Sequence, residues 1–200
     1  MAKSPDIHFL LLAAGESKRM GRIKQLLPWN NTTMLEHAIN EALQSNVKNI
    51  SLVLGANSEA ILSKIKPSKV DVFINKKWQN GIGSSIAYGI GEILKVSNPE
   101  AILIGLADQP LVNSAYYNQM LTKFRSDEKI MIASQYEKSY GVPALFGSYY
   151  YDSLLRLKGD EGAKKLILQF IDRLILMDGS EIHKDIDTIE MYKEALNSNN

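Results

Sequence analysis

The stretch that decides the fold of this chain reads Ile-His-Phe-Leu-Leu-Leu-Ala at residues 7–13 and Ala-Gly-Glu-Ser-Lys-Arg-Met-Gly-Arg-Ile-Lys at residues 14–24. The apolar run has the length and branching of a buried strand. The small residues Ala13, Ala14 and Gly15 at its end let another molecule approach the main chain. Four cations then fall within seven positions: Lys18, Arg19, Arg22 and Lys24. Accessible backbone N–H groups and clustered positive charge predict a loop that holds a polyphosphate.

Strand-like and helix-like segments alternate along the rest of the chain. The apolar runs that we expect to form strands lie at residues 7–13, 50–54, 70–74, 101–106, 130–134 and 174–177. The first amphipathic segment between them opens with Thr33 and Glu36, which have the spacing of a helix capping box. The alternation predicts one domain over residues 1–200 with an α/β fold. We expect a three-layer, Rossmann-like sandwich whose mixed sheet is mostly parallel and has helices on both faces.

One segment breaks the alternation. Residues 136–146 contain Pro143, whose backbone nitrogen cannot donate a hydrogen bond, so we expect a hairpin or loop insertion there and no central strand.

Ligands of parallel sheets lie beyond the carboxyl ends of the strands. The loops that should therefore face one common site are those after Leu12, Leu54, Ile74 and Leu106.

The overall composition limits the classes of function. A net charge of only +1 argues against a general nucleic-acid binder. The chain has no cysteine and no His-Glu-x-x-His pattern, which argues against a zinc site built from its three histidines: His8, His37 and His183. No apolar run reaches membrane-spanning length, and the first residues lack the apolar core of a secretory signal. We therefore expect a cytoplasmic protein that uses neither nucleic acid nor a membrane as a partner.

Other phosphate-binding motifs are absent from this sequence or incomplete in it. It has no Gly-x-x-x-x-Gly-Lys-Ser/Thr stretch, so it contains no P-loop. Gly81-Ile82-Gly83 begins a dinucleotide fingerprint, but the sixth position is Ile86 instead of glycine. Residues 14–24 remain the best candidate for a phosphate site.

Three aspartates in two segments of the chain suit a hard metal ion. Asp108 follows the apolar run 101–106, and Asp185 and Asp187 share one side of their segment if it is extended. Mg²⁺ takes one or two carboxylates together with phosphate oxygens. Helix capping is an alternative for Asp108, and for Asp187 or its neighbour Thr188. The residues alone leave both interpretations open.

Small polar residues follow two further expected strands. Gly81, Ser84 and Ser85 at a helix start offer N–H and hydroxyl groups that suit an anion or a base, and either serine equally suits a helix cap. Asn57 fits a nucleotide contact and a helix cap equally well.

Six motifs occur between residues 11 and 188. They are Leu-Ala-Ala-Gly-x-Ser-x-Arg-Met-Gly-x-x-Lys (12–24), Asn-x-x-Trp-x-x-Gly-x-x-Ser-Ser (75–85), Leu-Ala-Asp-x-Pro (106–110), Gly-x-Pro-x-x-Phe (141–146), Gly-Asp-x-Gly-Ala (159–163) and Asp-Ile-Asp-Thr (185–188). Together they resemble the MobA-like nucleotidyltransferases, and most of all the molybdenum cofactor cytidylyltransferases. Two positions depart from that pattern: Ile189 stands where proline is usual, and Val142 where histidine or asparagine is frequent.

The resemblance implies roles for particular residues. Arg19 and Lys24 would bind the phosphates of a nucleoside triphosphate, and with Asp108 they would form the catalytic set. Asp108 and Asp187 would hold Mg²⁺, with Asp185 as the second choice for the latter position. The nucleotide-binding set that we expect comprises Leu12, Ala13, Ala14, Gly15, Arg19, Lys24, Asn57, Asn75, Gly81, Ser84 and Ser85. The motifs at 141–146 and 159–163 would surround the acceptor substrate.

The implied activity is transfer of a cytidylyl group from CTP to molybdopterin, with release of pyrophosphate. We expect CTP to be preferred over GTP because Ala14 stands where guanylyl-transferring relatives carry a glycine, and its methyl group narrows the space beside the base. The alternatives are a guanylyltransferase, a transferase with another phosphorylated acceptor, and a non-catalytic nucleotide-binding regulator. A molybdoenzyme or a chaperone as protein partner fits the same family.

Overall fold

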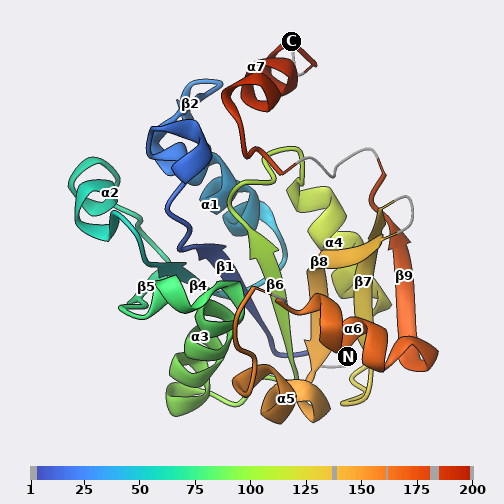
Figure 1. Cartoon of the computed structure of the whole chain (residues 1–200). Coiled ribbons are helices and arrows are strands. Elements are labelled where there is room, and N and C mark those ends of the chain that lie inside the picture. The colour runs from blue at the N-terminus through green and yellow to red at the C-terminus, as the bar shows by residue number, and fades with distance from the viewer. Residues whose placement is uncertain (1–3, 137–138, 161, 181–184, 199–200) are drawn as a thin grey trace.

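The computed structural model describes residues 4–136, 139–160, 162–180 and 185–198. Its centre is a 7-stranded sheet with the strand order β5-β4-β1-β6-β8-β7-β9 (Figure 1). The strands are β1 (Ile7–Ala13), β4 (Asn49–Leu54), β5 (Asp71–Ile74), β6 (Ala101–Leu106), β7 (Met131–Tyr136), β8 (Ser139–Gly147) and β9 (Leu174–Asp178). A separate ribbon pairs β2 (Pro28–Trp29) with β3 (Thr32–Thr33). Among the described strands of this sheet, only β8 runs antiparallel to its neighbours β6 and β7, so the sheet is mixed and mostly parallel, as predicted.

Helices cover both faces of the sheet (Figure 1). The helices are α1 (Met34–Gln44), α2 (Ser58–Lys64), α3 (Ile82–Val96), α4 (Ser114–Lys123), α5 (Tyr151–Leu155), α6 (Lys164–Gln169) and α7 (Ile189–Ser198). Successive side chains of β1 alternate between the faces: Phe9 and Leu11 pack with α1, α2 and α4, whereas Leu10 and Leu12 pack with α3, α5 and α6. The predicted three-layer α/β fold is thereby confirmed. The predicted capping box of Thr33 and Glu36 is also present at the start of α1.

The expectation for residues 136–146 was half right. β7 and β8 do form a hairpin, but β8 is an internal strand that pairs with β6 on one side and β7 on the other. The pairing is regular on both sides from Ala144 to Phe146 and shifts register between Ala133 and Ser134 of β7. Pro143 falls in this irregular stretch, where its missing N–H removes no ladder hydrogen bond. The exclusion of a central strand was therefore wrong.

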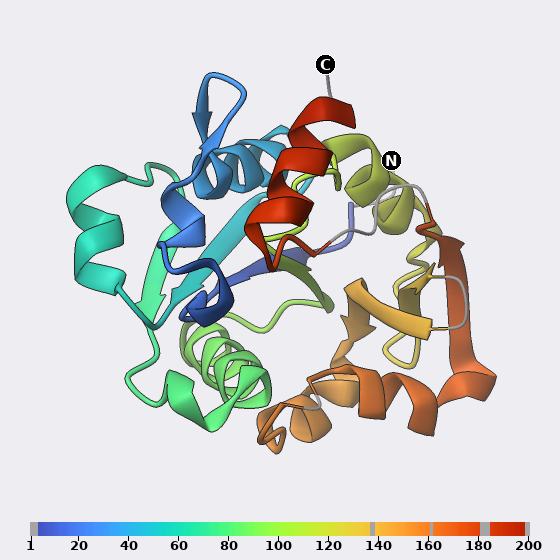
Figure 2. The same ribbon diagram turned by 45° about the horizontal axis from the view of Figure 1, so that its top comes forward.

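The C-terminal segment returns to the loop that follows β1 (Figure 2). Ile186, buried, and Ala195 of α7 pack against four residues from the N-terminal part of the chain: Met20, Leu27, Trp29 and Met34. The backbone N–H of Ile186 also donates to the carbonyl oxygen of Asp108 at 2.9 Å. These contacts hold residues 185–188 against the carboxyl edge of the sheet.

No helix in the described part of the chain is both long enough and apolar enough to cross a membrane.

Candidate active site

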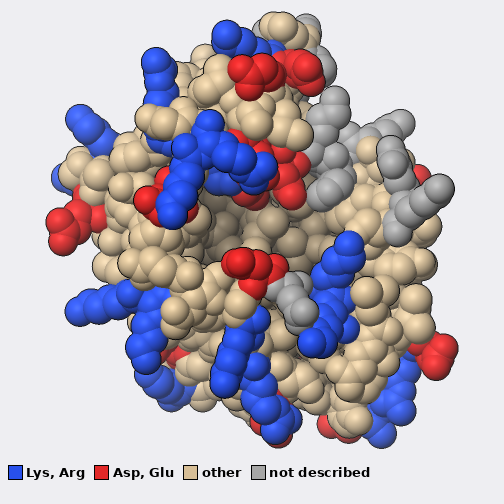
Figure 3. Space-filling view, in the orientation of Figure 1, with Lys and Arg blue, Asp and Glu red and all other residues tan. Residues whose placement is uncertain are grey.

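A cavity of about 490 Å³ opens at the carboxyl edge of β1 and β6. The view in Figure 3 shows a hollow on this side of the molecule, with acidic and basic side chains at its border. Ten of the predicted site residues line the cavity: Leu12, Ala13, Ala14, Gly15, Arg19, Lys24, Gly81, Ser85, Asp108 and Asp187. Four predicted residues do not line it: Asn57, Asn75, Ser84 and the second-choice metal ligand Asp185.

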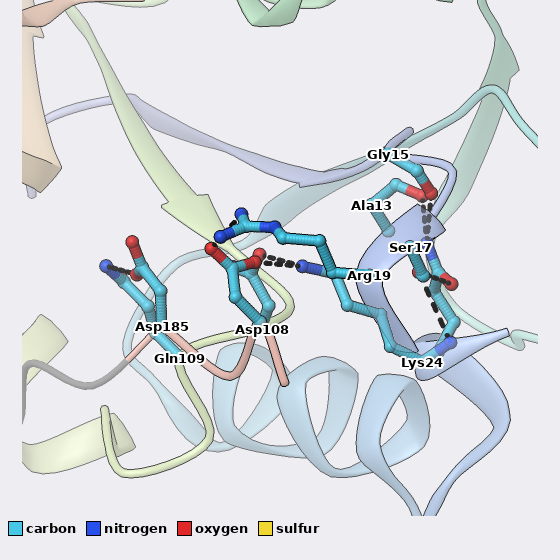
Figure 4. Close-up of polar contacts among 10 residues, drawn as sticks. Ala13, Gly15, Ser17, Arg19, Lys24, Asp108, Gln109 and Asp185 are labelled. Carbon is cyan, nitrogen blue, oxygen red and sulfur yellow. Dashed lines mark hydrogen bonds and ion pairs between the residues drawn. The ribbon is translucent and has the colours of Figure 1, made fainter. Parts of the chain in front are cut away.

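Lys24, Arg19, Asp108 and Asp187 meet in this cavity and form one charged cluster. Lys24 Nζ lies 2.5 Å from Asp108 Oδ2 and 3.3 Å from Asp187 Oδ1. Arg19 Nη2 donates to Asp187 Oδ2 at 2.6 Å. Figure 4 shows the Arg19 and Lys24 side chains extending toward Asp108. The cluster joins the loop after β1, the end of β6 and the C-terminal segment, which are remote from one another in sequence.

Lys24 is the most enclosed member of the cluster, with a side chain that is 12% exposed, whereas that of Arg19 is 70% exposed. Burial by itself lowers the pKa of the Lys24 ammonium group. The charges of Asp108 and Asp187, and the hydrogen bonds to them, more than offset this, so the pKa of Lys24 is raised above its ordinary value. Lys24 therefore stays charged at neutral pH, as a phosphate ligand must.

The carboxylate of Asp108 is suited to a cation. Its Oδ1 atom is buried and has no hydrogen-bond partner among the described residues. Helix capping does not account for Asp108, because Asn113 caps α4 by accepting from the N–H of Tyr116 at 3.0 Å. An unpaired oxygen of a carboxylate that shares its Lys24 contact with a second carboxylate fits a metal ion that completes its shell with water and phosphate oxygens.

Asp185 and Asp187 diverge, although the sequence suggested that they share one side. Asp187 contacts Lys24 and Arg19, whereas Asp185 Oδ1 accepts from Gln109 Nε2 at 2.8 Å (Figure 4). Thr188 Oγ1 accepts from the N–H of Met191 at 3.2 Å, so the capping contact at the start of α7 comes from the threonine. In the part of the chain that the structure describes, no group of three or more acidic or histidine side chains is placed to hold a metal. The protein would thus supply two carboxylates, Asp108 and Asp187.

Asn75 lies behind the cavity wall. The side chain is buried, and its Nδ2 atom donates to Ser84 Oγ at 3.2 Å and Ser85 Oγ at 3.1 Å. Ser84 Oγ donates onward to the carbonyl oxygen of Gly81 at 2.9 Å, and neither serine caps α3. Asn75 therefore positions Ser85, which does line the cavity.

The loop after β4 supports the site from outside, contrary to the expectation that it faces the ligand. A Cβ atom on Gly55 would lie 2.5 Å from Trp78 Cβ and 2.8 Å from the carbonyl oxygen of Ala14, so only glycine fits. The N–H of Ala56 donates to that same carbonyl oxygen at 3.1 Å. Asn57 takes the first position before α2 without a side-chain capping bond among the described residues.

A second hollow of about 200 Å³ adjoins the first. Both are lined by Leu12, Ile82, Leu106 and Asp160. The remaining wall of the second hollow includes the β7–β8 hairpin, the start of α6 and Asp185. Several residues of the two predicted acceptor motifs line it: Gly141, Val142, Asp160, Gly162 and Ala163. Glu161 of the second motif, and His183, lie outside the described residues.

Gln25 is a site residue that the sequence analysis missed. It lines the larger cavity, is 3% exposed, and donates from Nε2 to the carbonyl oxygens of Ala13 and Gly15, each at 3.0 Å. The sequence signal was its place directly after Lys24, the last residue of the first motif. An uncharged side chain beside several cations does not by itself indicate a role in phosphate binding.

The fold and this site together define a nucleotidyltransferase: a mostly parallel α/β sheet with cations and paired carboxylates at its carboxyl edge. The chain belongs to the MobA-like family, since the model of the MobA-like NTP transferase domain matches residues 9–174. It is 30% identical to the nicotine blue oxidoreductase of Paenarthrobacter nicotinovorans over 94% of this chain and 96% of that protein. It is 29% identical to the purine catabolism protein PucB of Bacillus subtilis (strain 168) over 95% of this chain and 96% of that protein.

Solved structures agree with this assignment. The crystal structure of Rv0371c from Mycobacterium tuberculosis H37Rv has a TM-score of 0.83 and 28% identity, covering 98% of this chain and 100% of that one. A structure of the same mycobacterial protein in complex with manganese has a TM-score of 0.80 and 27% identity, covering 96% of this chain and 99% of that one. The family and the general activity follow from these matches, and the substrates need a separate argument.

Proposed function

We propose that this protein transfers the cytidylyl group of CTP to a phosphorylated small molecule, of which molybdopterin is the best candidate, and releases pyrophosphate. The observation that carries the proposal is the meeting of Lys24 and Arg19 with Asp108 and Asp187 in one cavity. Cations that bind phosphates and carboxylates that bind a divalent metal are the two requirements of phosphoryl chemistry.

The acceptor in this reaction needs no general base. A phosphate monoester has a second pKa of about 6, so at neutral pH it is already a nucleophilic anion. The obstacle is the repulsion between this anion and the triphosphate. In this proposal Arg19 and Lys24, which line the cavity, reduce that repulsion and neutralise the charge that develops on the departing pyrophosphate.

The metal that we propose at Asp108 and Asp187 is Mg²⁺. When bound, it supplies charge neutralisation and orientation at the α-phosphate. The unpartnered Oδ1 atom of Asp108 supports this assignment, as does the carboxylate of Asp187, which contacts the same Lys24 ammonium group. The mycobacterial relative solved with manganese supports a divalent metal in proteins of this kind.

The two adjoining hollows fit two substrates. The larger one, with the glycine-containing loop and the cations, suits CTP. The smaller one, between the β7–β8 hairpin and α6, suits the acceptor, since the two hollows adjoin at Leu12, Ile82 and Leu106. Attack on the α-phosphate from that side would place the leaving pyrophosphate toward the cationic loop.

The choice of base is the least supported part of the proposal. Ala14 is 8% exposed and lines the larger cavity, and its carbonyl oxygen is fixed by the N–H of Ala56. A methyl group in this fixed position favours a one-ring base over a purine, by about 10- to 200-fold at most. A GTP preference would make the protein a guanylyltransferase and leave the rest of the proposal intact.

Two further functions are tested by the same experiment. A nucleotide-binding regulator would bind CTP without turnover, yet the retained Asp108 and Asp187 argue for catalysis. The name of the oxidoreductase relative suggests a redox reaction, for which the cationic loop offers no evident use.

The experiment is a panel of CTP, GTP, ATP and UTP, each with Mg²⁺ and molybdopterin, followed by pyrophosphate release. We expect release only when nucleotide, metal and acceptor are all present, and the fastest release with CTP. Asp108→Asn should abolish it, and Asp152→Asn, which changes an exposed aspartate on α5, should not. Binding of CTP without pyrophosphate release would favour a regulator, and neither binding nor release with any of the four nucleotides would favour the redox alternative.

A further inference from the structure

We propose that Gln25 is a positioning residue that sets the orientation of the phosphate-binding loop. The inference rests on the proposed function, because it assigns Gln25 a task in binding the triphosphate. Gln25 does so through backbone groups of the loop and need not touch the nucleotide itself.

The buried side chain of Gln25 forms hydrogen bonds that link several residues of the loop. Its side chain is 3% exposed, and Nε2 donates to the carbonyl oxygens of Ala13 and Gly15 at 3.0 Å each. Ser17 Oγ donates to Gln25 Oε1 at 3.5 Å, and the N–H of Lys24 donates to Ser17 Oγ at 3.3 Å. One side chain thereby connects Ala13 at the end of β1 with Gly15 and Ser17 of the following loop, three residues that Figure 4 labels.

Lys24 and Gln25 lie on the same short helix and make contacts with different parts of the site. They are consecutive residues of the 3-10 helix Lys24–Leu26. The Lys24 side chain reaches the carboxylates of Asp108 and Asp187, whereas the Gln25 side chain reaches back to the loop. The position of the phosphate-binding cation and the shape of the loop are therefore set by the same helical turn.

The orientation of carbonyl groups matters for an anion site. A carbonyl oxygen carries partial negative charge and repels a phosphate, whereas an N–H group attracts it. The carbonyl and the N–H of one peptide unit point in opposite directions. Because Gln25 holds the Gly15 carbonyl, the N–H of Glu16 points away from Gln25, and we expect it to serve the triphosphate. A Cβ atom at Gly15 would meet no described atom within 4 Å, so the space beside this peptide unit is open to a ligand.

Glutamine is the residue type that this task requires. The primary amide carries two donors for two carbonyl oxygens and one acceptor for a hydroxyl group. Methionine has nearly the same length and volume and no donor. Glutamate has the same shape, but its carboxylate would face both carbonyl oxygens and add a negative charge to the triphosphate site.

The experiment compares wild type, Gln25→Met and Gln25→Glu by two measurements. The first is amide hydrogen exchange of the peptide that covers residues 13–19, in the protein without nucleotide. The second is the dissociation constant of CTP with Mg²⁺, alongside that of CMP. Gln25→Met should speed exchange in this peptide and weaken CTP binding by about tenfold or more, since two hydrogen bonds are lost. Gln25→Glu should weaken CTP binding further, and CMP binding should change much less in both variants.

Ser51→Ala is the matched control. Ser51 is fully buried on β4, where its Oγ pairs with His8 Nε2 at 2.9 Å, and it does not line the cavity. The control variant loses a buried hydrogen bond and should leave loop exchange and CTP binding unchanged. Unchanged CTP binding in Gln25→Met, or equal losses for CTP and CMP, would overturn the inference.

The outcomes separate this inference from the proposed function. Wild-type protein that binds CTP but never releases pyrophosphate would refute the proposed reaction and leave the Gln25 comparison intact. Wild-type protein that transfers the nucleotide, with Gln25→Met equally active at low CTP, would refute the role of Gln25 alone. Failure of wild type to bind CTP or any of the other three nucleotides would refute both.

Discussion

Lys24 Nζ lies 2.5 Å from Asp108 Oδ2, although the two residues are 84 positions apart in the sequence. In the proposed reaction Lys24 binds the triphosphate and Asp108 binds the metal ion. Without either ligand the two side chains neutralise each other inside the cavity. Metal and nucleotide must therefore replace this pairing together, and each should bind poorly without the other.

Replacing Lys24 by alanine should lower transfer by about 10²–10³-fold, because one contact to the transition state is lost. Asp108 would also lose its cation in a mostly enclosed place, so the free energy of unfolding should fall by about 1–3 kcal/mol. Steady-state kinetics and urea denaturation measure the two effects. Lys95→Ala is the control, since that side chain is 67% exposed, pairs with Glu92 on α3 and does not line the cavity. Equal losses in the two variants would contradict the assignment.

The raised pKa of Lys24 predicts how stability varies with pH. A group whose pKa is raised by folding stabilises the native state fully below its unfolded pKa, and the effect fades as the pH rises through the folded value. The advantage of wild type over Lys24→Met should thus be constant near neutral pH and shrink above about pH 10.4, the unfolded value for lysine. Urea denaturation at a series of alkaline pH values tests this. An advantage that grows with pH would contradict it.

Asp187 and Asp185 should differ in their effect on metal binding. Asp187→Asn should weaken binding of Mg²⁺ to the protein–CTP complex by about tenfold or more, as expected when a ligand carboxylate is lost. Asp185→Asn should leave metal binding nearly unchanged, because Asp185 bonds to Gln109 in the neighbouring hollow. Titration calorimetry with Mg²⁺ at saturating CTP distinguishes them. A larger loss in Asp185→Asn would reverse the choice between the two aspartates.

Ala14→Gly should relax the choice of nucleotide. Removing the methyl group widens the cavity wall, so the ratio of kcat/KM for CTP to that for GTP should fall by about tenfold. Competition between equal concentrations of CTP and GTP measures this ratio directly. Ala87→Gly serves as control, since Ala87 lies on α3 and does not line the cavity. A ratio unaffected by Ala14→Gly would mean that base choice is made elsewhere.

Much of the fold follows from local sequence patterns. The capping box of Thr33 and Glu36 and the apolar runs of β1 and β6 need only neighbouring residues, and all were predicted at or within a residue or two of their observed bounds. The position of β8 was not predictable in this way. Whether a proline interrupts a strand depends on where the register of the partner strand shifts, and that is a property of β7.

The candidate site, like the fold, could be predicted from local sequence patterns only in part. Lys24 indicated phosphate binding by its type and its place in a cationic loop, whereas residue type left Asp108 open between a metal ligand and a helix cap until the family resemblance was considered. Both residues line the cavity. The separation of Asp185 from Asp187 depends on the bond from Ile186 N–H to the carbonyl oxygen of Asp108, which no local pattern reveals. Gln25 and Asn75 act through backbone and hydroxyl groups of other segments, and their roles become visible only once those segments are placed.

The most direct test of the central claim follows the fate of each phosphate of CTP. Wild-type protein is incubated with Mg²⁺, molybdopterin and CTP that carries a radiolabel on either the α- or the γ-phosphate. Nucleotidyl transfer predicts that the α-label appears on the acceptor and the γ-label in pyrophosphate, and that both vanish with Asp108→Asn. Release of the γ-label as orthophosphate, or an α-label that never leaves CTP with any phosphorylated acceptor, would contradict the account.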